Sequence, residues 1–119
     1  LKFKETCRIH AEAFSAAEVL HGPLALVGPD FPALALDPGD EGSESLCAAA
    51  TAFTSLGADL RYAGSPATGE ALPLPPGLPA ALLPLAQARA FYGALAALAQ
   101  SRGLDPDRPP HLSKVTRTV

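Results

Sequence analysis

The fold is decided by residues 31–63, FPALALDPGDEGSESLCAAATAFTSLGADLRYA. The first eight are an apolar run bounded by prolines, which is typical of a buried strand in a parallel sheet. From Asp40 to Leu56 apolar side chains recur at helical spacing, acidic residues stand near the helix N-terminus, and Gly57 is a typical helix stop. Residues 58–63 form a second strand candidate. A strand, a helix and a strand in this order predict a parallel α/β unit.

The segments after residue 63 extend this pattern. Residues 70–74 make a weaker third strand, because Pro73 cannot donate to a strand ladder. An Ala- and Leu-rich helix is expected from about residue 79 to residue 102, where Pro84 can kink it and Gly103 ends it. An irregular tail completes the chain.

The segments before residue 31 are harder to interpret. Residues 1–9 read as the end of a helix, residues 10–17 are ambiguous, and residues 18–27 form a loop and a short helix that starts at Pro23. The whole order predicts an α/β fold: a three-layer sandwich with a mostly parallel sheet, of which the chain is the C-terminal half.

Composition bounds the class of protein. The chain has 119 residues, enough for one domain with a modest core. A net charge of -3 without a basic stripe argues against a nucleic-acid partner. No apolar run free of charges and prolines reaches the roughly 20 residues that span a bilayer, so we expect no membrane span. Cys7 and Cys47 fit no disulfide or metal pattern, and we expect buried free thiols in a cytoplasmic protein.

Chemistry-bearing residues gather in two stretches. Residues 1–23, LKFKETCRIHAEAFSAAEVLHGP, place Lys2 and Glu5 one helical turn apart, so both side chains can point to the same place. His21 precedes a Gly-Pro turn, and its imidazole can accept and donate a proton near neutral pH. Residues 105–118, DPDRPPHLSKVTRT, carry Lys114 in the irregular tail. Taken singly, these residues read as an exposed ion pair, a polar loop residue and an exposed lysine.

The two stretches, in this order, resemble the catalytic loop and the C-terminal tail of the sugar isomerase (SIS) family. That family includes the isomerase half of glucosamine-6-phosphate synthase and stand-alone glucosamine-6-phosphate deaminases. The resemblance implies that Glu5 moves a proton between C1 and C2 of an open-chain sugar phosphate. It further implies that His21 opens the sugar ring, that Lys114 forms a Schiff base with the keto sugar, and that Lys2 tunes the other groups.

The resemblance also bears on partners. It implies a sugar-phosphate substrate and a homo-oligomer, expected as a dimer, in which His21 reaches the active site of a neighbouring subunit. No metal ion or organic cofactor is implied. His10 and Glu12 belong to the matched stretch, and we interpret them as loop architecture.

One element of the family pattern does not occur in the chain. Family members hold the sugar phosphate in a Ser/Thr-rich loop at a helix N-terminus, which suits a dianion. Because no such cluster occurs here, and because the first helix lacks a capping residue, we expect residues 1–119 to be the C-terminal portion of a SIS domain whose N-terminal part is missing.

The particular reaction is a finer prediction. Leu20 stands where the synthase has a lysine, and the sequence around Thr6 and Cys7 is closer to that of stand-alone members. We therefore expect a glucosamine-6-phosphate deaminase or isomerase of the stand-alone type. The alternatives are the isomerase domain of a glutamine–fructose-6-phosphate aminotransferase, a non-catalytic sugar-phosphate sensor, and a structural fragment that supports a partner.

Overall fold

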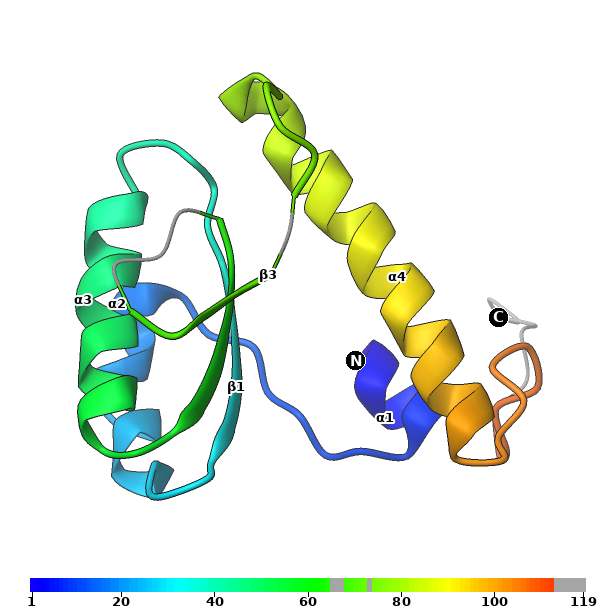
Figure 1. The fold of residues 1–119 in the computed structure, drawn as a ribbon. Coiled ribbons are helices and arrows are strands. Elements are labelled where there is room, and N and C mark those ends of the chain that lie inside the picture. Colours follow the sequence, from blue (N-terminus) through cyan, green and yellow to red (C-terminus); the bar gives the residue numbers. More distant parts are fainter. Residues whose placement is uncertain (65–67, 73, 113–119) are drawn as a thin grey trace, which may run out of the picture. The chain divides into compact units, whose positions relative to one another are not determined.

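The computed structural model describes residues 1–64, 68–72 and 74–112 (Figure 1). The chain divides into two compact units. One unit is Phe14–Ala88, and the other combines Leu1–Ala13 with the chain from Arg89 onward.

The Phe14–Ala88 unit contains a parallel sheet in the order β1-β2-β3 (Figure 1). The strands are β1 (Pro32–Leu36), β2 (Asp59–Ala63) and β3 (Glu70–Leu72). Both strand pairs are parallel, and the register sets Ala35 beside Tyr62. The predicted α/β fold with a parallel sheet is confirmed, with strand bounds close to the expected ones.

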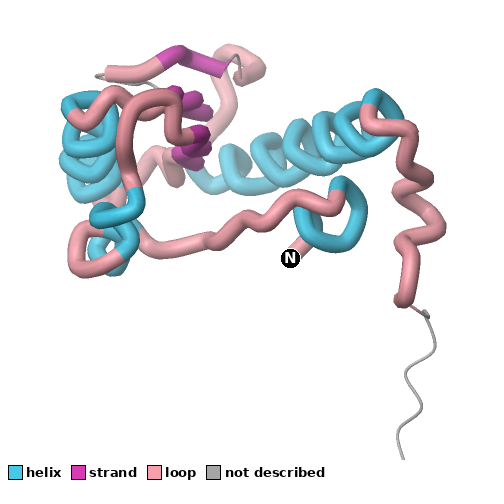
Figure 2. Tube along the Cα trace, turned by 90° about the horizontal axis from the view of Figure 1, so that it is seen from below, coloured by secondary structure: helices cyan, strands magenta, loops and turns pink. Residues whose placement is uncertain are grey.

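Helix α3 (Ser43–Ser55) covers one face of the sheet, and the short helix α2 (Ala16–Val19) lies on the same side (Figure 1, Figure 2). The core beneath α3 consists of buried side chains from both layers: Ala35, Ala50, Leu60 and Tyr62. Helix α3 starts three residues later than predicted, because the carboxylate of Asp40 accepts a hydrogen bond from the Gly42 N–H and forms a turn there.

The ambiguous stretch before residue 18 contains a helix start. Ser15 Oγ accepts a hydrogen bond from the Glu18 N–H, and Glu18 Oε2 accepts one from the Ser15 N–H. This reciprocal pair is a capping box, and it opens α2. After a turn that contains His21, the 3₁₀ helix η1 (Pro23–Leu26) begins at the predicted proline.

The predicted long helix is present as the 3₁₀ helix η2 (Ala80–Leu82) followed directly by α4 (Leu83–Ser101). Pro84 falls in the first turn of α4, where a missing N–H costs nothing. Gln87 is buried, and its Nε2 donates to the carbonyl oxygens of Asp37 and Ala63 at 2.6 and 2.9 Å. The first turns of α4 are thereby fastened to the carboxyl ends of β1 and β2.

Together η2 and α4, Ala80–Ser101, form a helix that is long and apolar enough to cross a membrane, judged by length and composition alone. The expectation that no segment reaches this length was therefore wrong, because Pro84 and Arg89 do not interrupt the helix. Gln87, Leu95 and Ala99 are buried in this helix, whereas only 11% of its apolar window is buried.

The second unit is built on α1 (Lys2–Cys7) and the C-terminal part of α4. Its buried centre is Cys7, Leu95 and Ala99, surrounded by partly buried apolar side chains: Phe3, Ile9, Phe91, Leu98 and Leu104. Cys7 is a fully buried free thiol, as predicted, whereas the free thiol of Cys47 is only half-buried.

Candidate active site

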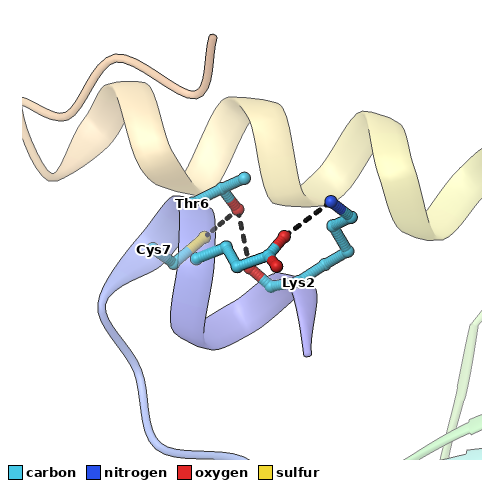
Figure 3. A network of polar contacts seen from close by, with 4 residues as sticks. Lys2, Thr6 and Cys7 are labelled. Atoms are coloured by element: carbon cyan, nitrogen blue, oxygen red, sulfur yellow. Dashed lines mark hydrogen bonds and ion pairs between the residues drawn. The ribbon is translucent and has the colours of Figure 1, made fainter. Parts of the chain in front are cut away.

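Helix α1 brings Lys2 and Glu5 together. Lys2 Nζ lies 2.6 Å from Glu5 Oε2, and both side chains keep contact with solvent. Thr6 Oγ1 donates to the carbonyl oxygen of Lys2 at 2.9 Å and lies 3.5 Å from Cys7 Sγ (Figure 3). The i, i+3 spacing predicted this juxtaposition of an amine and a carboxylate.

The electrostatics of the pair keep Lys2 positively charged. Its hydrogen bond to Glu5 and the charge of that carboxylate raise the pKa of Lys2 above its ordinary value, and Tyr92 on α4 adds a smaller effect in the same direction. Lys2 therefore stays protonated at neutral pH.

The loop after α1 is tied back to the helix. Lys4 Nζ lies 2.6 Å from Glu12 Oε1, and His10 Nε2 lies 3.2 Å from the same oxygen. The hydrogen bond and the charge of Lys4 lower the pKa of Glu12. This pairing supports the interpretation of His10 and Glu12 as loop architecture.

The other two candidate residues are His21 and Lys114. His21 is exposed in the turn between α2 and η1, where its N–H donates to the carbonyl oxygen of Glu18 at 3.1 Å. This turn belongs to the Phe14–Ala88 unit, whereas Lys2 and Glu5 belong to the other unit. Lys114 lies outside the described residues. Of the three candidates that the structure describes, Lys2 and Glu5 are the pair in contact.

A buried carboxylate that the sequence reasoning missed is Asp37, which directly follows β1. It accepts hydrogen bonds from the Gly39 N–H at 2.9 Å, from Ser43 Oγ, and from Tyr62 Oη at 3.4 Å. Burial raises the pKa of the Tyr62 phenol, and Cys47 and Asp37 add to this effect, so the phenol stays protonated and donates. The only sequence signal was an Asp at the end of a strand.

The hydrogen bonds of Asp37 join three segments at the carboxyl end of the sheet. Its partners come from the loop after β1, the first residue of α3 and the strand β2. Ligands of open α/β sheets bind beyond the carboxyl ends of the strands, so this network stiffens the edge where such a ligand would lie. Within the described ranges no group of three His, Cys, Asp or Glu side chains could hold a metal ion.

Comparisons with known proteins place the chain. No protein-family model matches it. It is 34% identical over 96% of its length to the glutamine–fructose-6-phosphate aminotransferase (isomerizing) of Thermotoga maritima, and 35% identical over 96% to that of Aeropyrum pernix. It covers 20% and 19% of those two proteins, so the chain spans about a fifth of the length of the curated relatives it matches.

Two solved structures share the fold. One is a protein from Silicibacter pomeroyi assigned as a phosphosugar isomerase, with a TM-score of 0.76 and 38% identity; the match covers 88% of this chain and 32% of that one. The other is the C-terminal domain of glucosamine-fructose-6-phosphate aminotransferase from Francisella tularensis, with a TM-score of 0.74 and 27% identity. That match covers 87% of this chain and 31% of the other chain.

The parallel α/β fold and these similarities place the chain with domains of the phosphosugar isomerase class. The chain is similar to proteins of the sugar isomerase (SIS) family, the family that its two motifs predicted.

Proposed function

We propose that this chain supplies acid–base groups to an enzyme that isomerises a hexose 6-phosphate. The observation that carries the proposal is the ion pair of Lys2 and Glu5 on α1, in a chain similar to proteins of the SIS family. The names of the matched relatives support a fructose 6-phosphate substrate.

Each candidate residue then has a chemical role. The amine of Lys114 attacks the C2 carbonyl of the open-chain sugar, and water leaves as the C=N bond forms. Glu5, as a carboxylate, removes a proton from one carbon and returns it to the neighbouring carbon, because a single base can reach both. Lys2 remains protonated and favours the neutral form of Lys114. His21 transfers the proton that opens the ring.

The fate of nitrogen separates two versions of this reaction. The curated relatives, matched over 96% of the chain, are isomerising aminotransferases, and we place that reaction first. A stand-alone deaminase or isomerase comes second. It was the version that the residues around Leu20 predicted, and the neighbour at 38% identity that is assigned as a phosphosugar isomerase supports the isomerase part of it. The comparisons do not support deaminase activity itself.

We further propose that residues 1–119 are the C-terminal portion of the catalytic domain, and that the phosphate-binding groups belong to another part of the protein. The match to about a third of each solved structure supports this division. The dimer with His21 in a neighbouring active site belongs to the same proposal.

The experiment uses the full-length protein with fructose 6-phosphate in D₂O. Deuterium incorporation at C1 or C2 is expected for an isomerase, whereas a sugar-phosphate sensor would bind without exchange. Adding glutamine and measuring glucosamine 6-phosphate tests the aminotransferase version. Supplying glucosamine 6-phosphate and measuring ammonia tests the deaminase version. Binding of the sugar without any exchange would reject the proposed activity.

A further inference from the structure

Helix α1, which carries both Lys2 and Glu5, is too short to be stable by itself. It has six residues, whereas isolated helices shorter than about 12–15 residues are marginal in water. Its first residue, Leu1, provides no side-chain cap. The direction in which Glu5 points therefore depends on the contacts that α1 makes with α4.

Apolar contacts fix the buried side of α1. The ring of Phe3 meets the ring of Phe91 edge to face, with centroids 5.4 Å apart. Cys7 is fully buried between Leu95 and Ala99, and its Sγ lies 3.5 Å from the carbonyl oxygen of Leu95. Burial of this kind is largely non-directional and a thiol is a weak donor, so a stronger polar contact is needed to fix how α1 is oriented along α4.

Arg102 provides that polar contact. Its Nε donates to the carbonyl oxygen of Cys7 at 3.0 Å, across 95 residues of sequence. Cys7 is the last residue of α1, and carbonyl groups in the last turn of a helix have no partner within the helix. The positive charge also suits the negative end of the helix dipole. Arg102 thus acts as a C-terminal cap supplied by a distant segment.

The backbone that presents Arg102 is itself fixed. Helix α4 ends at Ser101, and Gly103, two residues further on, has a φ of 70° in the left-handed region that glycine adopts without strain. The Leu104 N–H then donates to the carbonyl oxygen of Ala99 at 2.9 Å, and the Leu104 side chain packs against the buried cluster around Cys7. The backbone that carries the Arg102 side chain is therefore fixed by the turn that follows α4.

We propose that Arg102 is a positioning residue for Glu5: it holds the C-terminal end of α1 and so sets the direction of the catalytic carboxylate. This inference rests on the proposed isomerase function. Proton transfer needs a donor and acceptor about 2.6–3.2 Å apart, and a displacement of about 1 Å can cost roughly 100-fold in rate. Loss of Arg102 should therefore lower kcat and leave KM nearly unchanged.

The test compares three variants of the full-length protein in the D₂O exchange assay with fructose 6-phosphate. Arg102→Met keeps the length of the side chain but removes the donor, and we expect kcat to fall about 10- to 100-fold. Arg102→Lys restores a cationic donor and should recover part of the loss. Arg89→Met, an exposed arginine on the same helix, is the control and should behave like the unmodified protein.

The outcomes separate the inference from the function. Unchanged kcat in Arg102→Met would overturn the positioning role while leaving the isomerase function intact. A rise in KM equal to the fall in kcat/KM would also overturn it. If Arg102→Met does not fold, Arg102→Lys decides: a partial fall in kcat with KM and the unfolding midpoint unchanged supports the role, and a kcat equal to that of the Arg89→Met control contradicts it. Absence of exchange in the unmodified protein would reject both proposals.

Discussion

Glu12 fastens the loop after α1 through Lys4, and its titration should report this contact. Its pKa is lowered, so the stabilising contribution is present above the ordinary pKa of a glutamate and is lost as the pH falls through the lowered value. In Lys4→Met the pKa of Glu12 should rise toward its ordinary value. An NMR titration of the Glu12 carboxyl carbon measures this shift, and an unchanged midpoint in the variant would contradict the contact.

Lys114 should be the residue that binds the substrate covalently. Borohydride reduces an imine to a stable amine, so incubation of the full-length protein with fructose 6-phosphate and borohydride should attach the sugar to Lys114. Mass spectrometry of the digested protein locates the adduct. Lys114→Ala should abolish the labelling, and a label at another lysine would refute the assignment.

Residues were predictable where their partners are close in sequence. The spacing of Lys2 and Glu5 was sufficient to predict their contact, and Ser15 and Glu18 formed a capping-box pattern that could have been recognised. The roles of Asp37 and Arg102 could not be predicted, because each has partners far along the chain, at 25 and 95 residues. No local pattern specifies such a contact.

At the scale of elements, Gln87 connects α4 to the sheet. Because its amide donates to two strand-end carbonyl groups in a buried site, Gln87→Met should leave both without this partner and cost about 1–3 kcal/mol of stability. Urea unfolding of the full-length protein measures the loss, and Gln100→Met is the control, since Gln100 is exposed on the same helix. Equal midpoints for the two variants would show that the connection contributes nothing.

The main elements were predictable because each follows a strong local pattern. The apolar run of β1, the helical spacing of α3 and the Ala/Leu composition of α4 all gave bounds within a few residues of the structure. Helix α2 has only four residues, too few for a periodic pattern, and was missed for that reason. The parallel pairing of β1 with β2 followed from the strand–helix–strand alternation.

At the scale of the whole molecule, the proposed dimer predicts complementation. Glu5→Gln and His21→Ala should each be inactive alone. If His21 serves the active site of a neighbouring subunit, mixed dimers contain one site with both residues intact, and an equal mixture should recover about a quarter of full activity. Activity assays after unfolding and refolding the mixture test this. No recovery would place His21 and Glu5 of one subunit in the same site or reject the dimer.

The central claim is that Glu5 shuttles the proton, and exchange of a C1 proton of fructose 6-phosphate in D₂O tests it most directly. In the full-length protein, Glu5→Gln should retain sugar-phosphate binding but slow the exchange about 100-fold or more, because general acid–base groups contribute roughly 10²- to 10⁴-fold. Glu41→Gln, at an exposed position outside α1, is the matched control and should exchange normally. Near-normal exchange in Glu5→Gln would contradict the account.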